Sequence, residues 1–223
     1  MILGLAGILD QERLDRIGDV LGAARFADGA ATAGWHARLV KQNRQAAREE
    51  GTNEAAALVQ QALEGSDVFR SGVLPKRLVL PLFARYEPGM TYGSHVDDAL
   101  MAASEGRLRT DVAVTVFLSP PESYEGGELV VEETAGERSF KLPAGAAVAY
   151  PATTLHRVAP VTRGVRLVAV TWVESFVRDA AHREILFDLD QARRAIFAEK
   201  GKSREFDLVS KSYSNLLRRW AET

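Results

Sequence analysis

Two histidines and one aspartate are the residues of this chain whose types and spacing could hold a metal ion. His95 and Asp97 are two positions apart, and alternate side chains of an extended strand point to the same face, so both can reach one ion. The chain has four histidines and no cysteine, which restricts a third ligand to histidine or carboxylate. His156 follows a predicted strand, whereas His36 and His182 lie in helical flanks. We therefore predict His95, Asp97 and His156 as the metal ligands.

Two histidines and a carboxylate form the facial triad that is typical of non-haem iron(II) oxygenases. Such a triad leaves three coordination positions open, of which a 2-oxo acid can occupy two and dioxygen the third. The predicted cofactor is therefore Fe(II). Because iron cycles between oxidation states in this chemistry, ascorbate is the expected reductant.

Arg166 is the predicted anchor for the far end of 2-oxoglutarate. It lies ten residues after His156, with a turn signal at Arg163-Gly164 between them. If that turn joins adjacent antiparallel strands, the two side chains are offset by about three residues, or roughly 10 Å, which an extended five-carbon diacid bridges. The planar fork of an arginine binds a carboxylate through two hydrogen bonds.

Three regions of different character must position these residues. Residues 10–70 show helical periodicity, with Asp10 as an N-cap and a second helix over residues 53–63. Residues 78–176 contain short apolar runs between glycine and proline turn signals, a spacing that favours a sandwich or barrel. After residue 178, two helical stretches flank Gly201 and predict a hairpin. The predicted strands are Leu78–Tyr86, Val112–Leu118, Glu128–Glu132, Ser139–Leu142, Ala146–Tyr150 and Arg166–Val173.

Composition narrows the classes of function. Of the 223 residues, 46% are hydrophobic and 26% charged, as in an ordinary globular protein, and the net charge of −2 gives no electrostatic basis for binding nucleic acid or an anionic membrane. The apolar start has no basic residue before Asp10, unlike a secretory signal. No run approaches the roughly 18–20 apolar residues of a membrane span. We expect a cytoplasmic protein without a nucleic-acid or membrane partner.

Beyond the triad, the chain resembles the PKHD-type hydroxylases, which are PiuC-like bacterial proteins of the prolyl 4-hydroxylase branch of the Fe(II)/2-oxoglutarate-dependent dioxygenases. The similarity covers nearly the whole chain. The segments that carry it are Pro81–Tyr86, Thr91–Asp97, Tyr124–Val131, Lys141–Gly145, Pro160–Arg166 and Asn215–Trp220.

The resemblance implies a double-stranded β-helix, or jelly roll, with iron bound by His95, Asp97 and His156. It also implies that Arg166 binds the oxoglutarate tail, where the prolyl hydroxylases carry lysine. Members of the family are associated with ascorbate use and with bacterial iron uptake, so the resemblance implies these associations as well.

Three aromatic residues near the motif have more than one interpretation. Tyr86 matches a tyrosine that donates a hydrogen bond to oxoglutarate in that branch, but it could also be a core aromatic. The threonine that assists it there is replaced by Ala113. Tyr92 could form a wall of the substrate pocket or simply pack, and Trp172 could lie in the core or line the cavity. Arg157 and Arg163 are interpreted as solvated charges.

The predicted organisation is an N-terminal helical region (1–77) packed on a jelly-roll core (78–178), followed by a C-terminal helical hairpin (179–223). The expected function is that of an oxidoreductase, a dioxygenase that hydroxylates an unidentified peptide side chain or small molecule and releases succinate and CO2. Loops 98–108 and 120–125 are expected to shape the substrate pocket. The apolar stripes of the hairpin are consistent with a homo-oligomer.

Two alternatives remain at this point. The jelly roll could be a non-catalytic module that senses iron or 2-oxoglutarate, in which case it would produce no succinate. A site of two histidines and a carboxylate can also bind zinc for hydrolysis. A zinc hydrolase would work without dioxygen and would ignore oxoglutarate.

Overall fold

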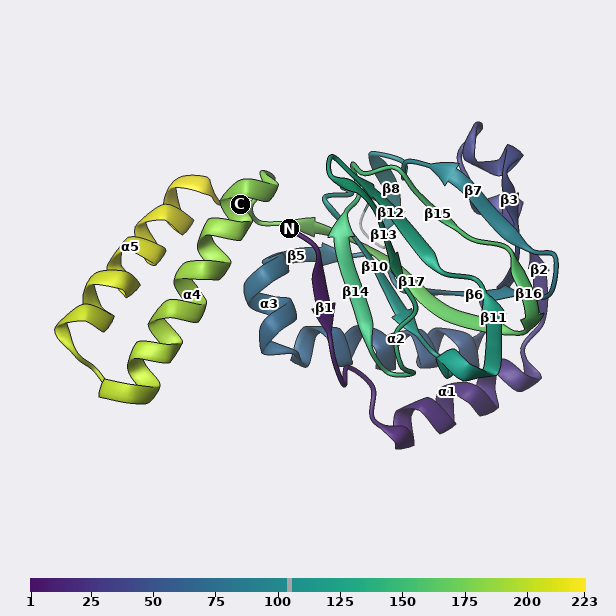
Figure 1. Ribbon diagram of the computed structural model, residues 1–223, viewed down its shortest axis with the longest axis horizontal. Coiled ribbons are helices and arrows are strands. Elements are labelled where there is room, and N and C mark those ends of the chain that lie inside the picture. The colour runs from purple at the N-terminus through teal and green to yellow at the C-terminus, as the bar shows by residue number, and fades with distance from the viewer. Residues whose placement is uncertain (104–105) are drawn as a thin grey trace.

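Two antiparallel sheets face each other in the computed structural model, and helices pack against one of them (Figure 1). The structure describes residues 1–103 and 106–223. The helices are α1 (Gln11–Ala23), α2 (Glu50–Gly65), α3 (Asp67–Val73), α4 (Ala180–Lys200) and α5 (Arg204–Trp220), with short 3-10 turns at Gly29–Thr32, Ala37–Leu39 and Pro121–Ser123.

Long-range strand pairing builds both sheets. The larger sheet contains, in spatial order, β1 (Leu3–Leu5), β14 (Ala147–Pro151), β10 (Val112–Phe117), β17 (Arg166–Ser175), β6 (Leu82–Tyr86), β4 (Arg44–Ala46) and β2 (Phe26–Asp28), and β5 (Pro75–Leu78) pairs with β17. The smaller sheet contains β13 (Gly136–Phe140), β12 (Leu129–Glu133), β15 (His156–Val158), β7 (Thr91–His95) and β3 (Lys41–Gln42). Two ribbons pair β11 (Tyr124–Gly126) with β16 (Val161–Gly164), and β8 (Leu100–Ala103) with β9 (Gly106–Arg109).

The larger sheet is buried on both faces, since α1, α2 and α3 cover one face and the smaller sheet covers the other. Strand β10 illustrates this arrangement. Val112, Val114 and Val116 pack with the helices, whereas Ala113 and Phe117 pack in the interior between the sheets. Because side chains alternate along a strand, burial on both faces requires the nearly continuous apolar run seen here.

Helix α1 begins where its sequence predicts. The Asp10 carboxylate accepts a hydrogen bond from the Arg13 N–H at 2.9 Å, which satisfies one of the free N–H groups of the first turn. Ile17 and Leu21, four residues apart on one face, are buried in the apolar core on the α2 side of the helix. Capping and apolar spacing therefore agree on both the start of the helix and the face it buries.

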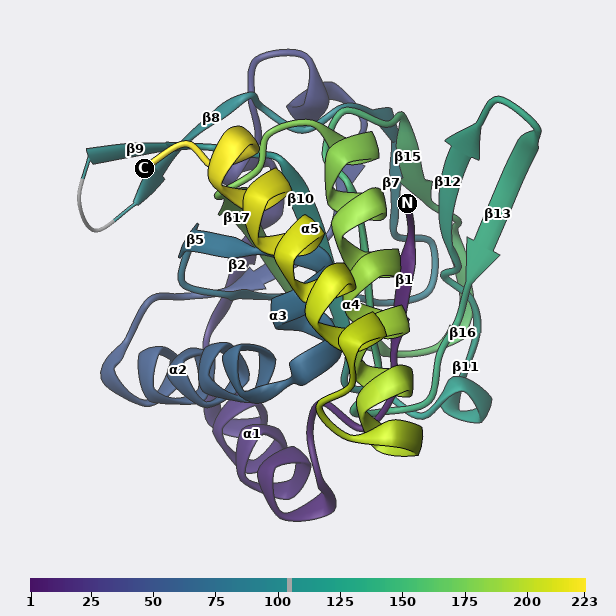
Figure 2. The ribbon, with the colours of Figure 1, turned by 90° about the vertical axis from the view of Figure 1, so that its left-hand side faces the viewer.

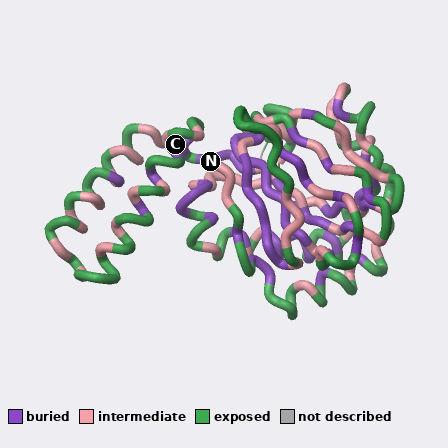
Figure 3. Tube along the Cα trace, viewed as in Figure 1, coloured by how far each residue is buried: buried purple, intermediate pink, exposed green. Residues whose placement is uncertain are grey.

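The C-terminal hairpin of α4 and α5 projects from the body of the molecule and lies in front in the second view (Figure 1, Figure 2). Asp179 caps α4, Ser203 caps α5, and Gly201 joins them with a positive φ of 63° that glycine adopts without strain. Most of the hairpin is exposed or half-buried (Figure 3). Its own small core consists of Val177, Leu186 and Tyr213.

The β-rich core and the flanking helices are as predicted, and an observed strand overlaps each predicted strand. Two local predictions were wrong. Residues 10–70 are not purely helical, since three strands lie there. Strands β2 and β4 belong to the larger sheet, and β3 belongs to the smaller sheet. The predicted strand Leu78–Tyr86 is two strands, β5 and β6, separated at Pro81, which has no N–H to donate to a ladder. Among the described residues, no helix is long and apolar enough to cross a membrane.

Candidate metal centre and co-substrate cavity

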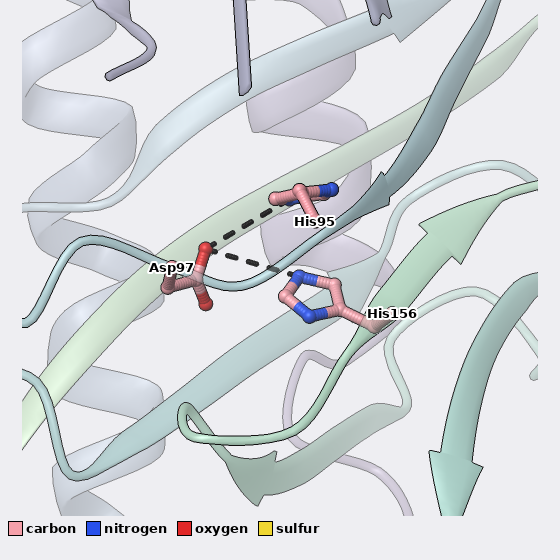
Figure 4. A group of neighbouring side chains, drawn as sticks. All are labelled: His95, Asp97 and His156. Atoms are coloured by element: carbon pink, nitrogen blue, oxygen red, sulfur yellow. Dashed lines mark ion pairs between the residues drawn. The ribbon is translucent and has the colours of Figure 1, made fainter. Parts of the chain in front are cut away.

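The three predicted metal ligands lie together beside the smaller sheet (Figure 4). His95 ends β7 and His156 begins β15, and the two residues are directly opposite each other in the paired strands. Asp97 Oδ1 is 4.0 Å from His95 Nε2 and 3.8 Å from His156 Nε2. One ligand atom from each of the three residues lies within 4.8 Å of the other two, so these residues could hold one metal ion between them.

Backbone carbonyls fix the orientation of both imidazoles. His95 Nδ1 lies 2.8 Å from the Gly93 carbonyl oxygen, and His156 Nδ1 lies 3.0 Å from that of Thr154. A carbonyl can only accept, so each Nδ1 carries the proton and donates it. Each Nε2 therefore directs a lone pair towards Asp97, as a metal-binding histidine requires.

Burial sets the charges at this centre. It lowers the pKa of His95 to about 3, with a smaller contribution from His156, so the His95 imidazole is neutral at physiological pH. Burial also raises the pKa of Asp97, and its Oδ2 atom has no hydrogen-bond partner among the described residues. Two imidazole nitrogens and one buried carboxylate without a counter-ion fit a divalent cation such as iron(II).

Arg166 is the second unusual charge in the interior. Its side chain is 1% exposed, and neither Nε nor Nη1 has a hydrogen-bond partner in the described part of the chain. Its guanidinium lies 5.0 Å from the ring centroid of Tyr86 and 5.7 Å from that of Phe117. A buried cation without a counter-ion is costly, so this position fits an anionic ligand.

The predicted strand relation between His156 and Arg166 was wrong. His156 lies on β15 of the smaller sheet, and Arg166 begins β17 of the larger one. The intervening strand β16 pairs with β11 instead of folding back on β15. The chain thus crosses from one sheet to the other, and Arg166 and the triad line the same cavity from different sheets.

The cavity between the sheets has a volume of about 330 Å³, and the triad, Arg166 and Tyr86 all line it. This volume lies at the lower end of the range of roughly 300–1,000 Å³ for small-molecule sites. Tyr92 also lines the cavity, and its ring is stacked on that of His95 with 3.6 Å between centroids.

Tyr86 pairs directly with Arg166, because β6 and β17 are neighbours. Burial raises the pKa of the Tyr86 hydroxyl, while the nearby Arg166 charge and the Asn43 amide act in the opposite direction. Ala113 carries no hydroxyl, but Thr115, two residues along the same inward face of β10, lines the cavity. Sequence analysis missed Thr115, although its parity with Ala113 was the available signal.

The loops predicted to shape the pocket differ in their positions. Asp98, Leu100, Met101 and Ala102 line the cavity, while residues 104–105 of the same segment lie outside the described residues. None of residues 120–125 lines it. Instead, an unpredicted wall comes from the N-terminal region, where Thr32, Lys41, Asn43 and Gln45 face the cavity.

Comparison with known proteins identifies the family. Residues 81–174 match the model of the 2OG-Fe(II) oxygenase superfamily, and residues 180–222 match that of the PKHD-type hydroxylase C-terminal domain. The chain is 51% identical over 223 residues to a PKHD-type hydroxylase of Synechococcus elongatus, with both proteins covered in full. The chain belongs to the PKHD-type hydroxylases. A hydroxylase of the 2OG-Fe(II) oxygenase superfamily uses iron(II), 2-oxoglutarate and dioxygen, which sets aside the zinc-hydrolase and sensor alternatives.

Solved structures confirm the predicted fold class of this PKHD-type hydroxylase. A prolyl hydroxylase from Trichoplax adhaerens, in complex with a hypoxia inducible factor peptide, aligns with a TM-score of 0.58 at 14% identity, covering 82% of this chain and 86% of that one. A viral collagen prolyl hydroxylase from Paramecium Bursaria Chlorella virus-1, in its 2OG complex, gives 0.55 at 19%, covering 78% and 96%. The two facing sheets are therefore the jelly roll of the 2OG oxygenases.

The other residues discussed from the sequence of this PKHD-type hydroxylase are not grouped with the three predicted metal ligands. His36 contacts the ring of Trp35, and His182 stacks on Trp220. Arg157 and Arg163 form surface ion pairs with Glu137 and Glu125. Trp172 lines the cavity, and its indole N–H opposes the raised pKa of Asp97.

Proposed function

We propose that His95, Asp97 and His156 bind the iron(II) of this hydroxylase, and that Arg166 binds the distal carboxylate of 2-oxoglutarate. The observation that carries the proposal is the buried guanidinium of Arg166, whose Nε and Nη1 have no hydrogen-bond partner among the described residues, in the same cavity as the triad. Arg166 is buried without a counter-ion and would bind one carboxylate of the diacid. The metal ion that Asp97 helps to hold would bind the other carboxylate.

Each residue has a defined task in this proposal. The Gly93 and Thr154 carbonyls hold the imidazoles so that their Nε2 lone pairs converge with Asp97 Oδ1. Iron(II), when bound, supplies open positions for oxoglutarate and dioxygen, and the coupled reaction yields succinate, CO2 and a hydroxylated substrate. Tyr86, on the strand beside Arg166, is positioned to donate a hydrogen bond to the co-substrate.

We further propose ascorbate as the reductant that keeps the iron in the iron(II) state, and a peptide side chain or small molecule as the prime substrate. A cytoplasmic location is supported by the absence of cysteine, which suits a reducing compartment. The net charge of −2 argues against a nucleic-acid partner. Exposed Ile185, Phe197 and Leu208 on the hairpin support a homo-oligomer.

Anaerobic titration with 2-oxoglutarate tests the ligand assignment. The iron(II)-loaded protein should develop a weak visible metal-to-ligand charge-transfer band as oxoglutarate binds. Arg166→Ala should require about a hundredfold more oxoglutarate, because losing one partner of a buried charged pair costs roughly 2–5 kcal/mol. Arg163→Ala, which removes a nearby exposed arginine, is the matched control and should titrate like the wild type.

Two results would contradict the proposal. If wild-type protein with iron demonstrably bound gave no band, oxoglutarate would not coordinate the metal at this site. If Arg166→Ala and Arg163→Ala titrated alike, the anchor for the distal carboxylate would lie elsewhere. Loss of iron binding in Asp97→Ala and His156→Ala, measured on the same preparations, would establish the ligand set independently of oxoglutarate.

A further inference from the structure

A polar strand face from the N-terminal region forms one wall of the cavity. Lys41, Asn43 and Gln45 line the cavity, whereas the intervening Gln42 and Arg44 are exposed. This alternation is that of an extended strand with one face turned inward. The inward face of such a segment is ordinarily apolar, so three consecutive inward polar residues indicate that this wall meets a polar ligand.

Lys41 is the charged member of this wall. Its ammonium donates a hydrogen bond to the Thr32 hydroxyl at 3.1 Å and lies 5.1 Å from the ring centroid of Tyr92. Within the described ranges of the chain, no carboxylate lies close enough to form an ion pair with it. Burial lowers the pKa of Lys41 to about 8, while the more distant Asp97 and Asp28 act in the opposite direction. The ammonium has thus lost part of its hydration without gaining a direct counter-ion.

Neighbouring groups hold this ammonium in place without using all its hydrogen-bonding capacity. The Thr32 hydroxyl that accepts from Lys41 lies 2.6 Å from Gln45 Oε1 and 3.0 Å from the Gly29 carbonyl oxygen. An ammonium has three N–H donors, so a ligand in the cavity could accept from those not directed at Thr32. The strand pairing places the ammonium beside the metal centre, since Lys41 pairs with Tyr92, whose ring stacks on His95.

The position of Lys41 gives the sign of the missing ligand, and this step rests on the proposed function. The positive charges of iron(II) and Arg166 balance the negative charges of Asp97 and 2-oxoglutarate, with both imidazoles neutral. Lys41 and Asp98 are the other charged side chains of the cavity wall, and no ion pair joins them in the described part of the chain. An anionic group of a substrate would give the ammonium the direct partner that it lacks.

We infer that Lys41 binds an anionic group of the prime substrate, such as a carboxylate, and so selects acidic substrates for hydroxylation. The ammonium anchors the anionic group from β3 and leaves the remainder of the substrate beside the metal centre. Thr32 and Gln45 are positioning residues that act on the substrate through Lys41.

Weak binding beside the metal can be measured with a paramagnetic ion. Protein loaded with Mn(II) and saturating 2-oxoglutarate is titrated with N-acetylglycine or N-acetylglycinamide, which differ in charge but hardly in shape. Enhanced NMR relaxation of the probe's methyl group reports binding close to the metal, and saturating oxoglutarate keeps the probe away from Arg166. The wild type should bind the carboxylate about tenfold more tightly than the amide, as a hydrogen bond to a charged group would give.

Two variants distinguish the effect of the Lys41 charge on probe binding from the effect of the total charge of residues 41–45. Lys41→Gln should bind both probes equally weakly while still binding Mn(II) and oxoglutarate. Arg44→Gln removes a charge from the exposed face of the same segment and should keep the wild-type preference. Equal binding of the two probes by the wild type, binding of neither, or an undiminished preference in Lys41→Gln would overturn the inference.

The same data distinguish this inference from the proposed function on which it rests. If Mn(II) and oxoglutarate bind but N-acetylglycine is not preferred over N-acetylglycinamide, the proposed function is retained and the proposed role of Lys41 is rejected. If oxoglutarate itself shows no relaxation by Mn(II), both fall together.

Discussion

The protonation of a single buried histidine links the metal centre to the stability of the metal-free protein. Because burial lowers the pKa of His95 from 6.5 to about 3, the unfolded chain binds a proton between these pH values that the folded chain does not. The free energy of unfolding therefore decreases as the pH falls below 6.5, by at most about 1.4 kcal/mol per pH unit. At neutral pH and above, neither state is protonated at His95 and the effect disappears.

We predict that metal-free wild type loses about 1 kcal/mol more stability than His95→Gln when the pH is lowered from 7.5 to 5.5. Urea unfolding at the two pH values measures the difference. His36→Gln, which replaces a half-buried histidine outside the triad, is the control and should follow the wild type. Parallel losses in wild type and His95→Gln would mean that the His95 imidazole is protonated as readily in the folded protein as in the unfolded chain.

At the scale of elements, the turn before β12 packs closely against the side chain of Arg166. Gly127 has a positive φ of 69°, and a Cβ there would lie 3.0 Å from Arg166 Cδ and 3.2 Å from Tyr124 Cε2. We predict that Gly127→Ala displaces Arg166 and raises the Kd for 2-oxoglutarate at least about tenfold, since small misplacements of a binding group are costly. The charge-transfer titration measures this change.

The control is Gly201→Ala in the hairpin turn. Gly201 has a similar φ of 63°, but a Cβ there would meet no atom within 4 Å. The substitution therefore also places alanine at a positive φ, but at a residue that does not line the cavity, and it should leave the oxoglutarate affinity unchanged. An unchanged affinity in Gly127→Ala as well would show that Arg166 tolerates the added methyl group.

The sequence predicted those elements whose hydrophobic pattern or capping signal lies within one continuous segment of several residues. Val112–Phe117 is a nearly continuous apolar run, and α1 has an N-cap and an apolar stripe. The triad lies in a short motif plus one distant histidine. Pairing between distant segments was not predictable, which is why the relation of His156 to Arg166 was wrong. The two- and three-residue strands β3 and β4 are too short for periodicity to stand out, and inward-facing Lys41 looks like a solvated charge until the cavity is known.

At the scale of the whole molecule, the C-terminal hairpin depends on a much smaller core than the jelly roll. Its buried apolar residues are Leu186 and Tyr213, which pack with Val177 just before α4, and the Arg193 guanidinium lies 4.0 Å from the Tyr213 ring centroid. The two ends of the hairpin meet where the Glu222 N–H donates to the Phe176 carbonyl and Arg109 pairs with the Glu222 carboxylate. Helix α4 also contacts α3, where Arg194 forms an ion pair with Asp67. Residues 179–223 are thus proposed to form a unit of their own.

We predict that Tyr213→Ala destabilises this unit by about 3 kcal/mol, the usual cost of truncating a buried aromatic side chain. Hydrogen exchange should show lost protection across α4 and α5, while the jelly roll keeps its protection and binds 2-oxoglutarate normally. Lys211→Ala, at an exposed position of the same hairpin, should change little. Simultaneous loss of protection in hairpin and jelly roll would show that the chain unfolds as a single unit.

The opposition of His95 and His156 across neighbouring strands has a consequence for folding. These residues are 61 positions apart (156 minus 95) in a chain without cysteine, so an ion held by both would act as the covalent cross-link that this protein otherwise lacks. Closing a loop of that length in the unfolded ensemble is worth about 4 kcal/mol in the chain-entropy model. The ion that serves the reaction would then also tether the two strands that carry its ligands, and iron supply would set how long the enzyme survives as well as how fast it works.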